Sequence, residues 1–265
     1  MIGSQIFPYD QYLKLERDHC PVCQTATTRR RHANTIDRYG FPVTIVGCEQ
    51  CQLVYLYTPM YQQGYLALYA GEPSPYRQLV WMTRSKEPYN LAKDRTSLFL
   101  SQQHYARDLA AWLNENILSP TWPPTRVLDI GGSTGMVSRV VAPDAKRTIV
   151  DPAESELQLV EHDQVVHGCL ESVYDLEGPY DLILCCQTLD HFLYPEWALW
   201  WCRQVVALRG RLYIDYVALS RIKIDHPCYF NDRSFRTLLA RTGWQIVLRR
   251  PSSGRNHIGY LCTPC

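Results

Sequence analysis

The stretch Arg126-Val-Leu-Asp-Ile-Gly-Gly-Ser-Thr-Gly135 is the strongest structural signal in the chain. Its first half is apolar and strand-favouring, which suits a short strand buried on both faces. Three glycines follow, and a helical pattern of apolar residues begins at Met136. A strand, a glycine-rich turn and a helix start together let a ligand approach backbone amides closely. For this stretch alone, a tight turn without a ligand is the alternative.

Two acidic residues follow strand-like runs beside this turn. Asp129 lies just before the glycines, and Asp151 ends the next strand candidate, residues 147–151. An acid at the second position can accept hydrogen bonds from both hydroxyls of a ribose. The turn has no basic residue for a pyrophosphate, and Ser133 and Thr134 interrupt the dinucleotide-binding glycine pattern. We therefore predict a nucleoside ligand without a phosphate chain, which disfavours an NAD-dependent oxidoreductase.

Residues 127–135 resemble motif I of the class I S-adenosylmethionine-dependent methyltransferases. Residues 180–184 with 189–192 resemble the fourth-strand motif of that family, and residues 208–214 resemble the approach to its fifth strand. The similarity runs roughly from residue 125 to the C-terminus and departs at Ser133, where many members carry glycine. It implies an α/β fold, a doubly wound Rossmann-like methyltransferase sheet with an antiparallel last strand, which we place at residues 258–261.

The same resemblance implies a set of cofactor contacts. Gly131 and Gly135 would let the backbone approach the methionine part of S-adenosylmethionine, Asp129 would orient that end, and Asp151 would hold the ribose. The residues expected beside the adenine are Cys169 and Leu170, and those expected to border the transferred methyl group are Cys186 and Gln187.

A second resemblance concerns the substrate side of the site. Asp225-His226-Pro-Cys-Tyr229-Phe230 resembles the Glu-His-x-x-Tyr-Phe stretch of the sugar C-methyltransferases. Those enzymes also carry an N-terminal four-cysteine zinc lobe followed by a tyrosine-rich connection, as this chain does. The resemblance implies that a base at His226, polarised by a carboxylate, removes a proton beside a ketone, and the enolate takes the methyl group. Two departures are Asp225 in place of glutamate and the lack of the C-terminal domain that those enzymes usually add.

Two histidines compete for the role of base near the transferred methyl group. We favour His226, with Asp225 in its local acidic environment, and expect His191 to bind or orient the acceptor. The alternative for His191 is a helix-start histidine bonded to the backbone. Because neighbours on an extended segment point in opposite directions, Asp225 need not touch His226. Tyr229 and Tyr76, the latter predicted to lie in a loop, are the predicted substrate contacts.

Two C-x2-C pairs, Cys20/Cys23 and Cys48/Cys51, organise the N-terminal segment. Each pair can direct two thiolates at one metal ion, and together they complete the tetrahedral shell of a structural zinc site. Such a shell has no open position, so we assign it no catalytic role. Free core cysteines or a redox pair are the alternative.

The 265 residues are enough for one large domain and a small one. We predict three segments: a zinc-binding lobe (1–57), a tyrosine-rich connection with a helical segment (58–124), and the methyltransferase domain (125–265). Helical spacing predicts a helix over residues 101–118. Tyr65 and Tyr69, four apart on a possible helix, are expected to serve packing.

Composition narrows the functional classes. A formal net charge of +1 disfavours nucleic acid as the main partner, since phosphate binding usually requires a strongly basic domain. The N-terminus shows no signal-peptide pattern, and no apolar run reaches the ~18 residues of a membrane span. The eleven cysteines are therefore expected in a reducing, cytoplasmic setting, as metal ligands or core residues.

The sequence therefore predicts a methyltransferase that uses S-adenosylmethionine on a small-molecule acceptor, a sugar or natural-product intermediate methylated on carbon or oxygen. The first alternative is an RNA methyltransferase that grips RNA with its zinc lobe. The second is a non-catalytic module that binds the cofactor or serves as a scaffold. A homo-oligomer is compatible with all of these hypotheses.

Overall fold

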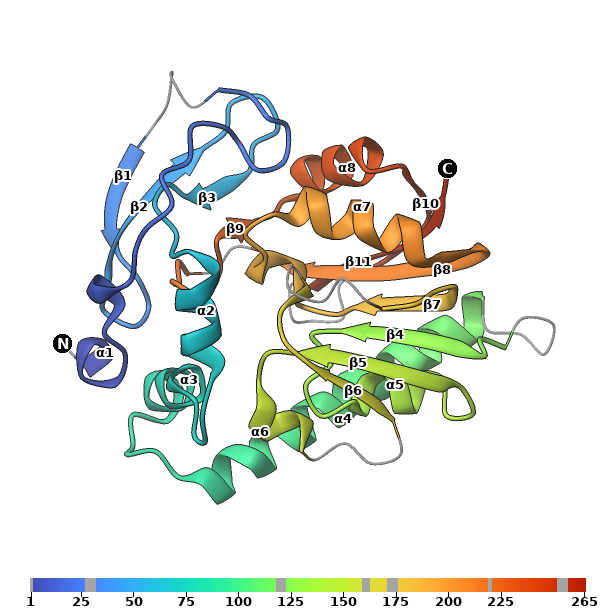
Figure 1. Cartoon of the computed structure of the whole chain (residues 1–265), viewed down its shortest axis with the longest axis horizontal. Coiled ribbons are helices and arrows are strands. Elements are labelled where there is room, and N and C mark those ends of the chain that lie inside the picture. Colours follow the sequence, from blue (N-terminus) through green and yellow to red (C-terminus); the bar gives the residue numbers. More distant parts are fainter. Residues whose placement is uncertain are drawn as a thin grey trace.

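The computed structural model describes residues 2–26, 32–117, 123–158, 163–170, 176–218, 221–251 and 257–265. Two sheets organise these residues (Figure 1). Neighbouring strands of the larger, seven-stranded sheet are, in spatial order, β10 (Trp244–Arg250), β11 (His257–Pro264), β8 (Val206–Val217), β7 (Tyr180–Cys185), β4 (Arg126–Ile130), β5 (Lys146–Asp151) and β6 (Gln164–His167). The pairings among β8, β7, β4, β5 and β6 are parallel, whereas β11 is antiparallel to both β8 and β10. The Rossmann-like methyltransferase sheet and its antiparallel last strand are confirmed.

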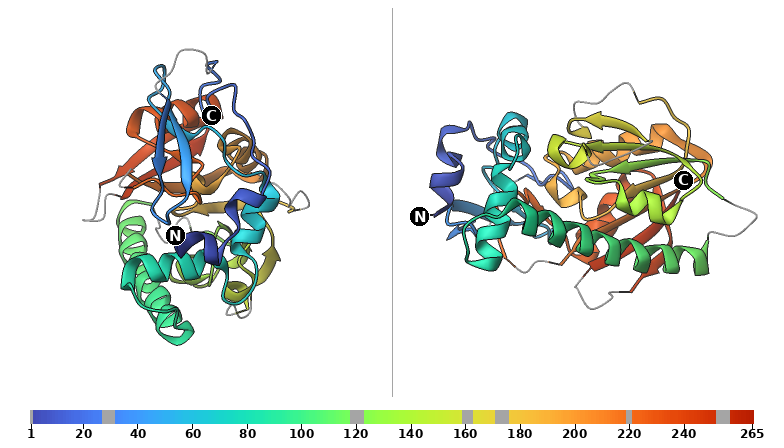
Figure 2. Two further views of the ribbon diagram at one scale, coloured as in Figure 1. Left: turned by 90° about the vertical axis from the view of Figure 1, so that its left-hand side faces the viewer. Right: turned by 90° about the horizontal axis from the view of Figure 1, so that it is seen from below.

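Helices cover both faces of this sheet because its central strands are apolar on both sides. On β7, Leu182 and Leu184 pack into the cluster formed with α4 and α5, whereas Ile183 and Cys185 belong to the cluster with α7 and α8. Figure 1 shows α7 and α8 over one face, and the right-hand view of Figure 2 shows α4 along the opposite face. The helices concerned are α4 (Leu91–Asn116), α5 (Met136–Val141), α7 (Pro195–Val205) and α8 (Asp232–Arg241).

The smaller sheet belongs mainly to the N-terminal segment. Its order is β1 (His32–Ile36), β2 (Pro42–Gly47), β3 (Val54–Leu56) and β9 (Cys228–Tyr229), all antiparallel. The first two strands form a hairpin, whose turn places Gly40 at a φ of 95°. The fourth strand comes from far along the chain, so the N-terminal sheet includes a piece of the segment between β8 and α8. Residues 228–229 therefore connect the two sheets.

The chain segment that connects the two sheets, called the connection below, is helical. It contains α2 (Gln62–Tyr69), α3 (Pro75–Ser85) and the first half of α4. Tyr76 was predicted to lie in a loop, but it lies in the first turn of α3, where the Ser74 side chain accepts a hydrogen bond from the Arg77 backbone N–H and proline occupies the first helical position. The helix predicted from residue 101 begins at Leu91, because Asn90 caps it in the same way. Residues 118–122, at its predicted end, lie outside the described residues.

The remaining short elements are α1 (Ile2–Ile6), η1 (Tyr9–Gln11), α6 (Glu154–Leu157) and η3 (Leu189–His191). Among the described helices, none has both the length and the apolar character needed to span a membrane.

Candidate active site

A cavity of about 690 Å³ lies at the carboxyl edge of the main sheet. Parallel strands end at the same edge, so the residues after β4, β5, β6 and β7 meet there. One face of α3 and the middle of α4 line the other side. In Figure 1, α2 and α3 stand between the N-terminal sheet and this edge. The cavity therefore lies between the strand ends of the main domain and the helices of the connection.

The glycine-rich turn after β4 forms one end of the cavity. Gly131 has a φ of +67°, and a Cβ built on it would lie 2.4 Å from the Thr188 side chain. Ser133 also adopts a left-handed conformation, with a φ of 50°, and its N–H donates to Asp151 Oδ2 at 2.8 Å. Residues 131–133 line the cavity, but Gly135 does not; it is the N-cap residue of α5. We predicted that Gly135 contacts the cofactor directly, but it is not among the described residues that line the cavity.

Two acids at the strand ends lie in this part of the cavity. Burial raises the pKa of Asp129 to about 6, and Asp129 accepts a hydrogen bond of 3.3 Å from the Ser138 N–H. Burial, together with the nearby charge of Glu156, raises the pKa of Asp151 to about 7. The Asp151 carboxylate also accepts a hydrogen bond from the Ala153 N–H at 2.8 Å. Both carboxylates line the cavity, so the structure places the two predicted acids beside the turn.

Sequence reasoning missed a layer of polar side chains around the turn. Gln102 on α4 donates to Ser133 Oγ at 2.9 Å and accepts a hydrogen bond from Thr134 Oγ1. Glu156 on α6 accepts a hydrogen bond from the Ser133 hydroxyl, and Arg77 Nε on α3 lies 3.9 Å from Glu156 Oε1. Helices α3 and α4 of the connection bring Arg77 and Gln102 to the turn, and the short helix α6 after β5 brings Glu156, so no motif near the glycines could have revealed them.

The other predicted cofactor residues also lie at the cavity. Cys169 and Leu170 line it after β6, and Cys186 and Gln187 line it after β7. Gln187 has a φ of 54°, and its N–H donates to the buried carboxylate of Asp215 at 2.7 Å. This bond holds the backbone of the segment that borders the middle of the cavity.

His191 lies on the wall of the cavity beside two tyrosines. Its Nδ1 atom lies 2.7 Å from the Tyr69 hydroxyl, and its ring lies 6.4 Å from the Tyr76 ring, edge on. All three residues line the cavity. Tyr69, which we expected to serve only packing, therefore reaches the site. Burial and the positive charge of His226 lower the pKa of His191 to about 4, so its imidazole is neutral at pH 7.

His226 lies behind His191, with ring centroids 4.3 Å apart, and is outside the cavity lining. Its Nδ1 atom is 2.8 Å from Asp190 Oδ2, and its Nε2 atom is 3.2 Å from Asp225 Oδ2. Lys223 Nζ lies 2.7 Å from the same Nε2 atom. Burial and Lys223 oppose protonation of His226, but the two carboxylates outweigh them and raise its pKa to about 9. His226 is therefore a poor base at neutral pH, contrary to our preference from the sequence.

The structure also places Asp225 and Tyr229. Asp225 contacts His226, because the chain turns here, with the His226 N–H donating to the Lys223 carbonyl at 3.2 Å, instead of running extended. Neither Asp225 nor Tyr229 lines the cavity. The Tyr229 hydroxyl donates to the Lys223 carbonyl at 2.7 Å and accepts a hydrogen bond from the Lys223 N–H at 2.6 Å, so it supports the loop from behind.

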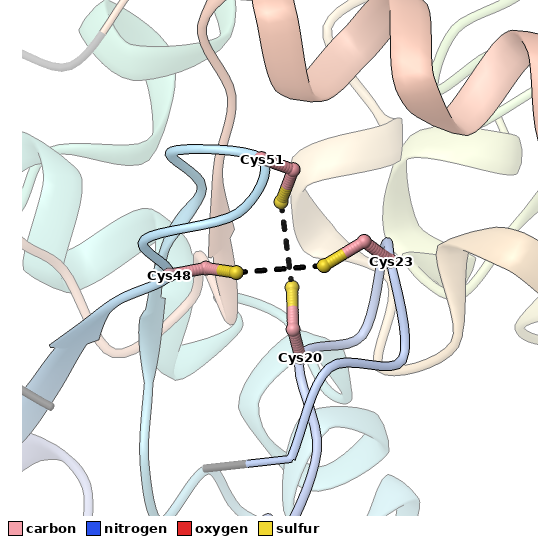
Figure 3. A group of neighbouring side chains, drawn as sticks. All are labelled: Cys20, Cys23, Cys48 and Cys51. Atoms are coloured by element: carbon pink, nitrogen blue, oxygen red, sulfur yellow. Dashed lines mark hydrogen bonds between the residues drawn. The ribbon is translucent and has the colours of Figure 1, made fainter. Parts of the chain in front are cut away.

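The four N-terminal cysteines form a cluster away from the cavity (Figure 3). Their sulfur atoms point toward a common centre and all lie within 4.8 Å of one another. Cys20 Sγ is 3.6 Å from Cys51 Sγ, and Cys23 Sγ is 3.4 Å from Cys48 Sγ. Four thiolates about 2.3 Å from one ion would have similar separations. The geometry of the cluster therefore fits a single tetrahedral metal ion.

Comparison with known proteins identifies the family. The sequence model of a family described as "Methyltransferase domain" matches residues 101–248, more than half of the chain. No curated protein matches the chain.

Solved structures share the fold at low sequence identity. The chain is similar to CalO1, a methyltransferase in calicheamicin biosynthesis solved in its SAH-bound form (14% identity, TM-score 0.51, 70% of this chain and 60% of that chain). It is also similar to the mitomycin 7-O-methyltransferase MmcR (13% identity, TM-score 0.50, 62% and 54%). A third is RosA from Streptomyces davawensis, an N,N-8-amino-8-demethyl-D-riboflavin dimethyltransferase (19% identity, TM-score 0.50, 71% and 62%). The match spans between 54% and 62% of those chains, and it shows the fold. On the strength of the matching domain, the chain belongs to the methyltransferase domain family.

Proposed function

We propose that this protein transfers a methyl group from S-adenosylmethionine to a small-molecule acceptor, a sugar or natural-product intermediate methylated on carbon or oxygen. One observation carries the proposal. A single cavity is lined both by the glycine turn and Asp151 and by the neutral imidazole of His191, which lies beside Tyr69 and Tyr76. Such a cavity offers room for a nucleoside and for an acceptor beside it.

The residues present fit the cofactor. The backbone of residues 131–133 is open to the cavity, and Asp151 supplies a carboxylate that would hold the ribose hydroxyls. Cys169 and Leu170 would lie beside the adenine. S-adenosylmethionine, when bound, supplies an electrophilic methyl group. The work left to the protein is to orient the donor and acceptor and to remove a proton from the acceptor.

His191 is the residue that we assign to proton removal, in place of His226. It is neutral at pH 7, it faces the cavity, and its pKa is low because of burial and the charge on His226. Once His191 has taken a proton, Asp190 Oδ1, 4.0 Å from its Nε2 atom, would stabilise the cation. That carboxylate oxygen is buried and has no hydrogen-bond partner among the described residues. His226 would hold Asp190 in place through the 2.8 Å contact.

We also propose one structural zinc ion on Cys20, Cys23, Cys48 and Cys51. The sulfur separations of 3.4 and 3.6 Å support it. Four protein ligands would close the coordination shell, so the ion would stabilise its lobe and take no part in methyl transfer.

Calorimetry with S-adenosylmethionine and its demethylated product tests the cofactor directly. Incubation with labelled S-adenosylmethionine and panels of keto sugars, phenols and RNA then tests the acceptor class, with His191→Ala as the variant that should bind cofactor but transfer poorly. Label in a small molecule supports the proposal. Label only in RNA, or no cofactor binding, would contradict it.

A further inference from the structure

The segment 222–229 carries Lys223, Asp225 and His226, and its backbone bonds mostly to the N-terminal lobe. The Arg38 N–H donates to the Ile222 carbonyl at 2.8 Å. Farther along, the Leu56 N–H donates to the Pro227 carbonyl at 3.1 Å, and β9 then pairs with β3. The lobe therefore contacts this segment on both sides of His226.

Asp37, at the start of the β1–β2 hairpin turn, makes a further contact with this segment. Its Oδ1 atom accepts hydrogen bonds from the Tyr39 and Phe41 N–H groups, both at 2.8 Å, and so closes its own turn. Its Oδ2 atom accepts from the Ile224 N–H at 2.9 Å. The side chain is buried, with 5% of the residue exposed. One Asp37 oxygen therefore accepts hydrogen bonds within the hairpin. The other accepts a hydrogen bond from Ile224, the residue before Asp225.

The lobe also holds the segment that follows His191. Arg17, which is buried, donates from Nη2 to the Leu193 carbonyl at 2.7 Å. From the connection, the Tyr65 hydroxyl donates to the Ile224 carbonyl at 3.1 Å. Both histidine-bearing segments are therefore fixed to residues that precede the methyltransferase domain in the chain.

We propose that Asp37 is a positioning residue for the histidine pair: through the Ile224 amide it fixes His226 between Asp190 and Asp225, and so sets the charge that His191 meets. It acts through the backbone of another segment and touches no ligand. The inference goes beyond methyl transfer because it concerns how the histidine pair is positioned. That arrangement can be measured without any acceptor. It rests on the proposed function only for the role of His191.

The charges around His226 determine how a displacement of its loop would change its pKa. The titratable groups in contact with it come from η3 and from its own loop: Asp190, His191, Lys223, Asp225 and Tyr229. Tyr39, Tyr69 and Tyr76, from the hairpin turn and from α2 and α3, interact with the Asp225 carboxylate. The two aspartates favour its charged form. If the loop that carries His226 moves away from Asp190, His226 loses its favourable interaction with that carboxylate, and its pKa falls toward its ordinary value.

Asp37→Asn is the sharpest perturbation. The asparagine oxygen can still accept from the Tyr39 and Phe41 amides, so the hairpin turn keeps its bonds. The amide group would then meet the Ile224 N–H donor to donor, and that contact is lost. Asn34→Ala is the matched control, because Asn34 lies on the same hairpin, is exposed, and bonds only to the Thr44 hydroxyl among the described residues.

Two NMR measurements on cofactor-free protein test the proposal: the titration of the His226 ring, identified by its absence in His226→Gln, and hydrogen exchange of the Ile224 amide. In Asp37→Asn we expect faster exchange at Ile224 and a His226 midpoint lower by about one pH unit or more. Asn34→Ala should change neither. Faster exchange with an unchanged His226 midpoint would reduce Asp37 to a purely structural role and overturn the proposal.

A measurement on the unmodified protein covers the case in which Asp37→Asn does not fold. The Ile224 amide should then exchange with the same opening free energy as the Tyr39 and Phe41 amides, because one carboxylate holds all three. Rapid, unprotected exchange at Ile224 would overturn the proposal. Absence of methyl transfer with any acceptor would leave these results unchanged, so the two proposals fail separately.

Discussion

Replacing Asp151 with asparagine should remove a pH-dependent loss of stability from the cofactor-free protein and weaken its affinity for the cofactor. Burial and the charge of Glu156 raise the pKa of Asp151 from 3.8 to about 7. A shift of about three pH units corresponds to roughly 4 kcal/mol, the free energy by which the fold disfavours the ionised carboxylate. The hydrogen bonds from the Ser133 and Ala153 amides offset only part of that cost.

The sign follows from proton linkage. A carboxyl group whose pKa is raised in the folded state binds its proton more tightly there than in the unfolded chain. Its stabilising contribution is complete below the unfolded pKa and is lost as the pH rises through about 7. Asp151→Asn has no proton to lose, but its amide group must meet either the Ser133 or the Ala153 N–H donor to donor, so it should be less stable than the wild type near pH 4. Between pH 4 and pH 8 its free energy of unfolding should rise relative to the wild type by up to about 4 kcal/mol.

Cofactor affinity should change in the opposite direction. Only the ionised carboxylate can accept hydrogen bonds from both ribose hydroxyls, and each such charge-assisted bond contributes about 1.5–3 kcal/mol. Loss of one bond weakens binding by roughly 10- to 100-fold. For the wild type, affinity should also decline as the pH falls below about 7, where Asp151 becomes protonated.

Urea denaturation at pH 8 and pH 5 and calorimetry with S-adenosylmethionine measure the two effects. Asp163→Asn is the matched control. Asp163 is buried, with 1% of its side chain exposed, but it lies outside the cavity lining and pairs with Arg147 at 2.7 Å. Its replacement should lower stability and leave cofactor affinity unchanged. An Asp151→Asn protein whose stability relative to the wild type does not rise between pH 5 and pH 8, with undiminished affinity, would refute the reasoning.

Four further predictions concern the histidines, Tyr69 and the cysteines. His191→Ala should lower turnover by about 10²–10⁴-fold with cofactor affinity intact. His226→Gln removes a cation beside His191, so it should raise the pKa of His191 above about 4 and move the midpoint of the acidic limb of the pH–rate profile to higher pH. Tyr69→Phe, which deletes the 2.7 Å contact with His191, should lower turnover about tenfold in initial-rate assays, the effect of losing one neutral hydrogen bond. Elemental analysis should find about one zinc per chain, and Cys20→Ser should reduce zinc content and unfold the lobe at lower urea concentrations.

The parts of the fold that sequence could predict are those that local patterns determine. The turn at residues 131–133 follows from glycines after an apolar strand, and Asp151 is located by the end of the next strand. The order of strands and helices predicts which residues gather at the carboxyl edge, since parallel strands end together. The two cysteine pairs come together because each is a short local motif, and a hairpin brings the two motifs to one place.

The parts that sequence could not predict depend on contacts between distant segments. Asp190 and His226 lie 2.8 Å apart but 36 positions apart in the chain, and no periodicity relates them. The pairing of β9 with β3 joins the segment between β8 and α8 to the N-terminal sheet, and only the folded structure shows it. The preference for His226 as the base rested on a local motif, whereas the neighbours that raise its pKa, Asp190 among them, come partly from segments that the motif does not contain.

The charges near the cavity differ between the glycine turn and His191. Lys223 and His226 balance Asp190 and Asp225 behind His191. At the glycine turn, Asp129, Asp151 and Glu156 lie together, and Arg77 is already engaged by Asp94 at 2.6 Å. The turn therefore carries excess negative charge, and the charge of Glu156 adds to burial, the larger cause, in raising the pKa of Asp151. Within the proposed function, this excess favours a cationic sulfonium over its neutral demethylated product, because the electrostatic attraction disappears when the methyl group leaves. The same acids that make the empty site less stable would thus promote cofactor binding and product release.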